Sequence, residues 1–211
     1  MSRLQTSFVL GYHGCDRKLG LDAVTGNVPL IPGKSKFDWM GHGIYFWESD
    51  PMRALEWAQQ KSKRGACADP FVIGAVIDLG NCLDLLAREN VELVRFAYES
   101  FKEVQEKAGI PLPINKKAPK DASPELVMRY LDCAVFDHLH SIIDGPSRPK
   151  GLEPYDTVRA VFREGTPIYA GSMLTDKNHA QIAVRNPKCI KGIFIPLDAA
   201  NILSTDAKPD V

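Results

Sequence analysis

The stretch that most constrains this chain covers residues 41–58 and reads GHGIYFWESDPMRALEWA. Glycines flank a turn that leads into a short aromatic run, IYFW, which is typical of a buried strand. Ser49 or Asp50 can cap a following helix, and Pro51 suits the first helical position because its backbone angle is already helical. The stretch therefore predicts a strand, a tight corner and a helix over 51–63.

The aromatic side chains at this corner admit two interpretations. Tyr45, Trp47 and Trp57 could form a flat pocket in which a planar ligand stacks. They could equally be ordinary core residues, because large aromatic side chains are commonly buried. The corner alone does not decide between a ligand site and a core.

The composition is that of an ordinary globular protein, with 45% hydrophobic and 25% charged residues in a chain of 211. The 26 basic residues equal the 26 acidic ones, so the formal net charge is zero. This balance argues against binding to nucleic acid without sequence preference, because such binding depends on an excess of Lys and Arg. We expect a single domain over residues 1–211, with its core over about 7–196 and a tail over about 200–211.

Cysteine and histidine positions do not indicate a metal site. The five cysteines are scattered and form no CxxC pair, so we expect neither a zinc site nor a disulfide framework. His138 and His140 lie two positions apart on a predicted helix and point to different sides, so we expect them to be surface or partly buried helix residues. Cys133 has no adjacent activating partner. No signal peptide or membrane-spanning run is found, which favours a cytoplasmic protein with no membrane partner, although secretion as an effector stays open.

Hydrophobic periodicity predicts the remaining elements. Strands are expected over 7–12, 43–47, 71–79, 157–162, 181–185 and 190–196. Helices are expected near 19–25 and over 51–63, 90–108 and 123–145. The third of these is expected to bury one apolar face, formed by Leu93, Phe96, Ala97, Phe101 and Val104. The first strand is expected to end in a tight turn at His13 and Gly14. Together the elements predict an α+β domain with a helical elaboration over about 90–145.

Three short motifs follow one another along the chain: Tyr12-His13-Gly14, Gly43-Ile44-Tyr45-Phe46 and Ala180-Gln181-Ile182. Through these motifs the chain resembles the ADP-ribosyltransferase superfamily, in the branch of diphtheria toxin and poly(ADP-ribose) polymerase. That branch carries a His-Tyr-Glu triad on three separate strands. The resemblance covers about residues 7–196. It implies a split antiparallel β-sheet core with flanking helices, which takes NAD as co-substrate and needs no metal.

The resemblance implies a role for each matching position. His13 would bond the ribose hydroxyls of the adenosine half of NAD, and Tyr12 precedes it in the same NAD-binding motif. Gly14 would present its backbone amide and carbonyl to the nicotinamide carboxamide. Tyr45 would stack on the nicotinamide ring, and Trp57, on the following helix, would form the other wall. Without the resemblance, these positions are equally typical of a strand-end histidine, a turn glycine and core aromatics.

The third position of the triad departs from the family pattern. Active members commonly place glutamate there, where it bonds the nicotinamide ribose and stabilises the charge that forms as nicotinamide leaves. Gln181 can make the same hydrogen bond, but it carries no charge and cannot act as a base. The enzyme would then be slow or restricted to mono-transfer, or an acid such as Glu164, Asp176 or Glu48 would supply the charge. In the remaining case, the fold would bind a nucleotide without turnover.

The turn-rich link over 163–179 occupies the place where the superfamily has its acceptor-recognition loop. Glu164, Tyr169 and Ser172 are therefore predicted to contact the acceptor. The same composition is also typical of any loop that joins two strands.

The sequence thus predicts an NAD-dependent mono-ADP-ribosyltransferase that modifies a protein or a nucleic acid. Bacterial relatives of this size imply a toxin, a secreted effector or an antiphage module, with an antitoxin or immunity protein as a possible partner. The alternative is a catalytically silent module that binds NAD or ADP-ribose, or another protein, on the same fold. Transfer of an RNA 2'-phosphate to NAD is a third option, although the relatives that catalyse it carry more basic motifs than this chain.

Overall fold

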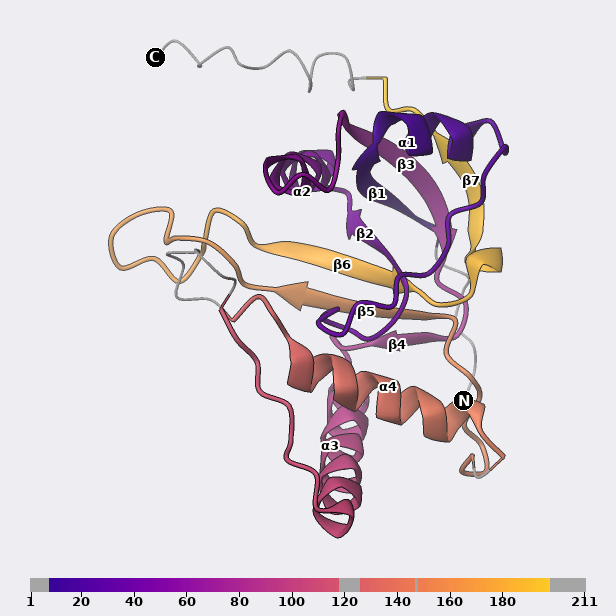
Figure 1. Cartoon of the computed structure of the whole chain (residues 1–211), viewed down its shortest axis with the longest axis vertical. Coiled ribbons are helices and arrows are strands. Elements are labelled where there is room, and N and C mark those ends of the chain that lie inside the picture. The colour runs from indigo at the N-terminus through magenta and orange to yellow at the C-terminus, as the bar shows by residue number, and fades with distance from the viewer. Residues whose placement is uncertain (1–7, 118–125, 147, 198–211) are drawn as a thin grey trace. The chain divides into compact units, whose positions relative to one another are not determined.

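A computed structural model describes residues 8–117, 126–146 and 148–197. Within these ranges the protein is α+β, with four α-helices and seven strands that pair mostly antiparallel (Figure 1). The chain divides into two compact units. The first unit draws on Met1–Leu30, Phe46–Asp78 and Ile190–Val211, and the second on Ile31–Tyr45 and Leu79–Cys189. The predicted tail over 200–211 lies outside the described residues.

The first unit is built around two long antiparallel strands, β1 (Phe8–Asp16) and β3 (Pro70–Asp78). They pair along their whole length, from Phe8 opposite Asp78 to Asp16 opposite Pro70. Strand β7 (Ile190–Phe194) continues the sheet beyond β3. On the other side of β1, the end of β2 (Ile44–Glu48) pairs only at Gly11 and Tyr12.

Two helices cover opposite faces of these strands. In α1 (Arg17–Val24), a Cβ added to Gly20 would lie 2.9 Å from the Phe71 ring, so this helix packs closely on β3. On the other face, α2 (Pro51–Lys63) approaches β1 at Gly14. Phe71 packs on the α1 side and Val72 on the α2 side. The two residues are neighbours on β3, so their side chains point to opposite faces of the strand.

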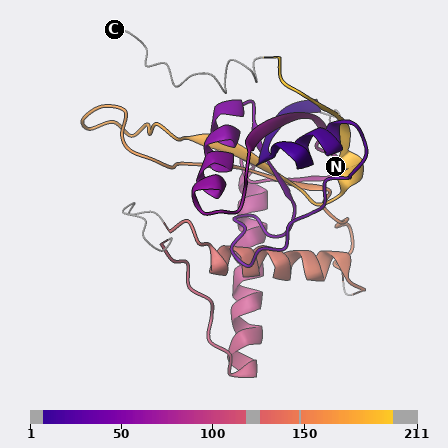
Figure 2. The same cartoon turned by 45° about the horizontal axis from the view of Figure 1, so that its top comes forward.

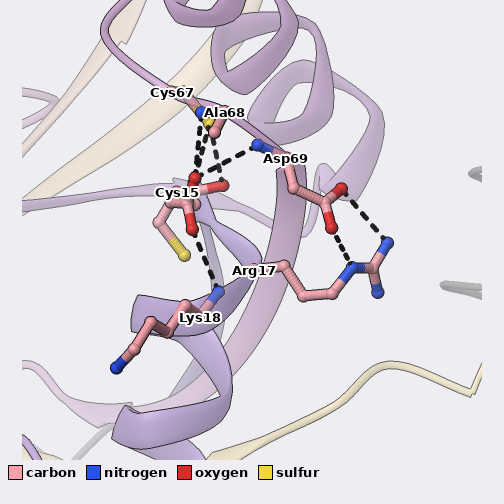
Figure 3. Close-up of polar contacts among 7 residues, drawn as sticks. Cys15, Arg17, Lys18, Cys67, Ala68 and Asp69 are labelled. Carbon is pink, nitrogen blue, oxygen red and sulfur yellow. Dashed lines mark hydrogen bonds and ion pairs between the residues drawn. The ribbon is translucent and has the colours of Figure 1, made fainter.

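The junction between β1 and α1 is fixed by Asp16, which bonds three residues labelled in Figure 3, Lys18, Ala68 and Asp69. Its carboxylate accepts hydrogen bonds from the backbone N–H groups of Asp69 (3.1 Å), Ala68 (2.9 Å) and Lys18 (3.1 Å). These bonds lower the pKa of Asp16 because they stabilise its charged form, and the bond from Asp69 has the largest effect. Arg17 adds an ion pair to Asp69 at 2.6 Å. The end of β1 is therefore tied to the segment that enters β3.

The sequence prediction for this unit is correct for α2 and wrong for the end of β1. The side chain of Asp50, rather than Ser49, caps α2 by accepting a hydrogen bond from Arg53 N at 2.9 Å. By contrast, β1 continues through His13 and Gly14 to Asp16, with no turn at these residues. Gly14 is buried within a regular strand, where tertiary packing and not a turn requires glycine.

The second unit contains a small sheet of β4 (Cys82–Asp84), β5 (Thr157–Phe162) and β6 (His179–Val184). Strands β4 and β5 are parallel, whereas β5 and β6 are antiparallel with Thr157 opposite Val184. The three-residue strand β4 was not predicted, because so short a segment has no detectable periodicity. The loop between β5 and β6 projects beyond both strands (Figures 1 and 2).

Helices α3 (Arg88–Ala108) and α4 (Tyr130–Asp144) pack on each other and cross steeply in both views (Figures 1 and 2). The buried side chains that fill the core of this unit include Met40, Leu83, Phe101, Val135, Phe136, Leu139, Ile143, Val158 and Ala183. Gly109 ends α3 in the left-handed conformation, at φ 65°. In the described part of the chain, no helix combines the length and apolar character that crossing a membrane would require.

Two expectations for these helices are corrected by the structure. Phe96 and Val104 were expected on the buried face of α3, but they are 69% and 51% exposed. The partners available to α3 cover a narrower stripe than its apolar pattern, so these two side chains face solvent. Helix α4 begins at Tyr130 rather than near residue 123, because Met128 is held in a backbone bridge with Lys116. Residues 118–125 lie outside the described residues.

Candidate functional site

The backbone of β1 at Gly14 is the first element of the candidate site. Ser49 N donates to Leu10 O at 2.9 Å, which shows that the backbone groups of Leu10 point toward β2. Because these groups alternate in direction along a strand, Tyr12 and Gly14 direct theirs to the same side. Pairing with β2 ends at Tyr12. The N–H and C=O of Gly14 therefore lie on an edge of β1 beyond the β1–β2 ladder.

Close helix packing explains why this position is glycine. A Cβ added to Gly14 would lie 2.0 Å from the backbone oxygen of Ala54 and 3.3 Å from the Cβ of Ala58, both on α2. No side chain fits there without displacing the helix. The predicted role of Gly14 toward NAD stays a prediction, but its backbone edge and its tight contact with α2 are properties of the fold.

The other predicted residues of the first unit lie on two faces of β1. Tyr12 and Trp57 pack against one cluster, formed by Trp47, Ala54, Leu55 and Val72. The rings of Trp47 and Trp57 are 6.2 Å apart, and the ammonium group of Lys61 lies 5.6 Å from the Trp57 ring. His13 is on the opposite face, with its ring centre 5.6 Å from that of Phe46. Within this unit, the structure thus groups Tyr12 with Trp57 but not with His13.

In the second unit, Tyr45 is held by its hydroxyl group. The hydroxyl oxygen accepts a hydrogen bond from Met40 N at 2.8 Å, and the O–H donates to Gly41 O at 2.7 Å. Burial raises the pKa of Tyr45 well above its usual value, so the phenol is neutral. The ring is half-buried against the core cluster of the unit. These contacts fix the orientation of the Tyr45 ring and leave part of the side chain exposed.

The two glycines before Tyr45 allow close approach. Gly41 has φ 77°, a conformation that favours glycine, and an added Cβ would lie 3.0 Å from both Asp137 Oδ1 and the Phe136 Cβ. At Gly43 an added Cβ would lie 3.2 Å from the Ala183 Cβ on β6. The GHG segment is therefore compressed between α4 and β6, which positions the tyrosine that follows.

Gln181 lies on β6 opposite Ala160 of β5 and is only 8% exposed. Its side chain points to the same face of the strand as those of His179 and Ala183. The described residues offer no hydrogen bond to its side-chain amide, although neither amide atom is completely shielded from solvent. The amide is therefore available to a ligand that reaches this face.

The three acids considered as substitutes for the missing glutamate lie in different places. Glu164 is 3.8 Å from His179 Nδ1, and His179 is the residue two positions before Gln181 on the same face. Asp176 accepts hydrogen bonds from Thr166 N (2.7 Å) and Thr166 Oγ1 (3.3 Å), which lower its pKa and close the loop. Glu48 lies at the end of β2, in the first unit. Of the two acids in the unit that holds Gln181, Glu164 is thus the one connected to the Gln181 face.

The predicted acceptor loop contains both exposed and buried residues. Tyr169 is 65% exposed, and its neighbours at the tip of the loop, Ile168, Met173 and Leu174, are also more than half exposed. Ser172 is buried at 7% exposure, where its Oγ accepts a hydrogen bond from Leu174 N at 3.0 Å. The tip therefore presents apolar side chains, while Ser172 maintains the shape of the turn.

In the described part of the second unit, two of the cavities are lined by neither Tyr45 nor Gln181. The larger, about 420 Å³, has mainly aromatic and aliphatic walls, with the Arg129 guanidinium stacked 4.0 Å from the Trp39 ring. The smaller, about 370 Å³, is polar and is lined by Pro32, His42, Asp137, His140, Ser141, Asp144 and Arg185.

Sequence reasoning missed the polar group beside the smaller cavity. His42, Cys133 and Asp137 come together there, with one potential ligand atom of each residue within 4.8 Å of the others. Burial, followed by the nearby Asp137 and Asp38 carboxylates, raises the pKa of Cys133 to about 12, so its thiol is protonated. The four-residue spacing of Cys133 and Asp137 on a predicted helix was the available signal, since it places both on one face.

His140 is buried more completely than the sequence suggested. It was expected to be a surface or partly buried residue, but it is 4% exposed, and neither ring nitrogen has a hydrogen-bond partner in the described part of the chain. Burial, with the nearby Arg185 and His42, lowers its pKa to about 3, so the ring is neutral. His138, two positions earlier, instead lies 3.1 Å from Ser100 Oγ.

Comparisons with known proteins do not assign the chain to a family. No protein-family model and no curated protein matches the sequence, and no solved structure matches the fold.

Proposed function

We propose that this protein is an NAD-dependent mono-ADP-ribosyltransferase. The observation that carries the proposal is the backbone of Gly14, whose N–H and C=O lie beyond the β1–β2 ladder, in a motif of histidine and glycine. A free N–H and C=O on one residue can pair with a carboxamide, which offers one acceptor and two donors. The nicotinamide of NAD carries such a group, and the family resemblance of the motifs at His13 and Tyr45 also favours NAD.

In this proposal each residue acts on a different part of NAD. The family resemblance assigns the carboxamide to the backbone of Gly14 and the ribose of the adenosine half to His13. It assigns stacking on the nicotinamide to the anchored Tyr45 ring. The bond between nicotinamide and C1' of the ribose breaks, and its electron pair leaves with nicotinamide. A nucleophile of the acceptor then bonds to C1' and gives up its proton to solvent.

Gln181 distinguishes this proposal from a second candidate, a silent module that binds NAD or ADP-ribose. The amide can bond the ribose hydroxyl but cannot supply the negative charge that stabilises the developing positive charge on the ribose. A nearly buried, uncharged residue at this position is the observation that favours binding without turnover. The two candidates share a ligand and differ in whether nicotinamide is released.

Loss of His13 or Tyr45 is the direct test of the transferase. We expect purified protein with NAD and a cell lysate to release nicotinamide and to label a macromolecule with ADP-ribose. His13→Ala and Tyr45→Ala should each lower this release by about 100-fold, since mispositioning a substrate by about 1 Å can cost that much. Nicotinamide release is measured by chromatography and labelling by a tagged NAD analogue.

The matched control is His138→Ala, which removes a histidine of α4 that neither motif contains. Labelling that survives both site substitutions would eliminate the site. NAD binding by calorimetry with no nicotinamide released, whatever the acceptor, would identify the silent module instead.

The apolar tip of the β5–β6 loop is proposed to contact the acceptor. Exposed apolar side chains grouped on a projecting loop are typical of a protein-binding surface. The double variant Tyr169→Ser and Met173→Ser should therefore lower labelling of the acceptor by about 10-fold, the effect of losing about 1.4 kcal/mol of binding. NAD hydrolysis in the absence of acceptor should not change. Equal losses in both assays would show that the loop acts on NAD or on folding.

A further inference from the structure

The cluster of His42, Cys133 and Asp137 has the composition of a transition-metal site. Cys133 and Asp137 are four positions apart on α4 and share one face of the helix. His42 faces them from the segment between Gly41 and Gly43. Imidazole, thiolate and carboxylate together are donors that suit zinc, whereas calcium and magnesium favour oxygen ligands only.

Two of the three distances within the cluster match tetrahedral coordination, and the third, between His42 and Cys133, is within 4.8 Å. Asp137 Oδ2 lies 3.4 Å from His42 Nε2 and 3.7 Å from Cys133 Sγ. Zinc bonds of about 2.0 Å to nitrogen or oxygen and about 2.3 Å to sulfur place tetrahedral ligand atoms roughly 3.3–3.6 Å apart. Asp137 Oδ2 lies at nearly this distance from both His42 Nε2 and Cys133 Sγ. These side chains therefore need to move little to coordinate an ion.

The surrounding contacts hold the ligands in this arrangement. Asp137 uses its other oxygen, Oδ1, to accept a hydrogen bond from the backbone N–H of His42 at 3.2 Å. The S–H of Cys133 donates to Ser35 O at 3.4 Å, a bond that the sulfur–zinc bond would replace. Gly41 packs against α4 so closely that any side chain would crowd Asp137. Support of a ligating carboxylate by a second hydrogen bond is a usual feature of metal sites.

His140 provides a second, independent observation. It is 96% buried, and both ring nitrogens lack a hydrogen-bond partner in the part of the chain that the structure describes. Buried polar atoms of this kind are uncommon and call for an explanation. His140 lines the cavity of about 370 Å³ together with His42 and Asp137. A water bound to a metal at the mouth of this cavity would give the ring a partner.

We propose that His42, Cys133 and Asp137 bind one zinc ion, with an open fourth position facing the cavity. On binding, the sulfur–zinc bond replaces the sulfur–hydrogen bond of Cys133, and the proton passes to solvent. The ion joins residues 41–43 to α4. Because the hydroxyl of Tyr45 donates to Gly41 O, zinc also stiffens the segment that orients Tyr45. This site does not depend on the proposed transferase activity, and it departs from the sequence-based expectation of no metal.

Binding is tested on the full chain after removal of metals with a chelator. Titration with Zn²⁺ against a chromophoric competitor should show one equivalent bound, and Zn²⁺ should raise the melting temperature. Co²⁺ in place of Zn²⁺ should produce the near-ultraviolet absorption band of a thiolate–cobalt bond. Cys133→Ser should abolish that band, and Cys133→Ser and Asp137→Asn should each weaken Zn²⁺ binding at least 10-fold.

The matched control is Cys189→Ser, which removes another buried cysteine of the same unit outside the cluster. It should leave both the stoichiometry and the cobalt band unchanged. If Cys133→Ser does not fold, as judged by circular dichroism, His42→Ala replaces it, since that side chain is 40% exposed on a loop. The absence of the cobalt band in the unmodified protein would overturn the proposal, as would unweakened binding in the cluster variants.

Discussion

Replacing Gly14 with alanine is expected to destabilise the protein by about 3 kcal/mol or more, at or beyond the upper end of the usual cost of overpacking. The added Cβ would lie 2.0 Å from the backbone oxygen of Ala54. A backbone atom within a helix cannot rotate away as a side chain can, so α2 must shift as a whole from β1. Urea denaturation followed by circular dichroism measures the loss as a lower midpoint.

Gly192→Ala is the matched control for this substitution. Gly192 also lies on a strand of the first unit, β7, but an added Cβ there meets nothing within 4 Å and its φ is not in the left-handed region. Its replacement should be neutral or slightly stabilising, because alanine restricts the unfolded chain. Equal midpoints for the two variants would contradict the close packing of α2 on β1.

The elements that were predicted well are those whose signals are local. Helix α2 has its bounds at the predicted residues because Asp50 and Pro51 supply the cap and the first helical position. Strand β5 likewise follows from its own apolar residues, with no need of its neighbours. The end of α3 is correct because Gly109 can adopt the left-handed conformation that closes a helix.

The errors occur where distant residues decide the local structure. Gly14 was interpreted as a turn residue, but it is glycine because α2 returns to β1 some forty residues later in the sequence. Phe96 belongs to an apolar pattern that is wider than the surface available to α3. Strand β4 exists only because Thr157, Val158 and Arg159 lie beside it. Periodicity within a short window contains none of this information.

The same limit applies to the candidate sites. The motifs around His13, Tyr45 and Gln181 could be found in the sequence, because each is a short run with a recognisable resemblance. The group of His42 with Asp137 could not, because the two residues are 95 positions apart. Only the packing of the GHG segment against α4 brings them together.

The charge that supports catalysis is expected to come from Glu164. Its side chain is 16% exposed, and its carboxylate lies 3.8 Å from Nδ1 of His179, whose side chain is 1% exposed on the Gln181 face. A negative charge held in a poorly solvated place acts more strongly than one in water. If the proposed transferase uses this charge, Glu164→Gln should slow nicotinamide release by about 100- to 1000-fold, the effect of one preorganised electrostatic group. The rate is measured with saturating NAD, so that weaker binding does not contribute.

Gln181→Glu is the complementary test, because it adds a carboxylate where Glu164→Gln removes one. In the double variant Glu164→Gln with Gln181→Glu, the new carboxylate should restore most of the rate lost in Glu164→Gln alone. The ribose would then meet a negative charge directly. Asp176→Asn is the control, since Asp176 bonds Thr166 within the loop and should leave NAD cleavage nearly unchanged. A transferase that is equally active with and without Glu164, and is unaffected by Gln181→Glu, would have no need of an acid at either position. Nicotinamide departure would then depend on the orientation that Gly14 and Tyr45 impose, and the search for electrostatic support would move to the acceptor itself.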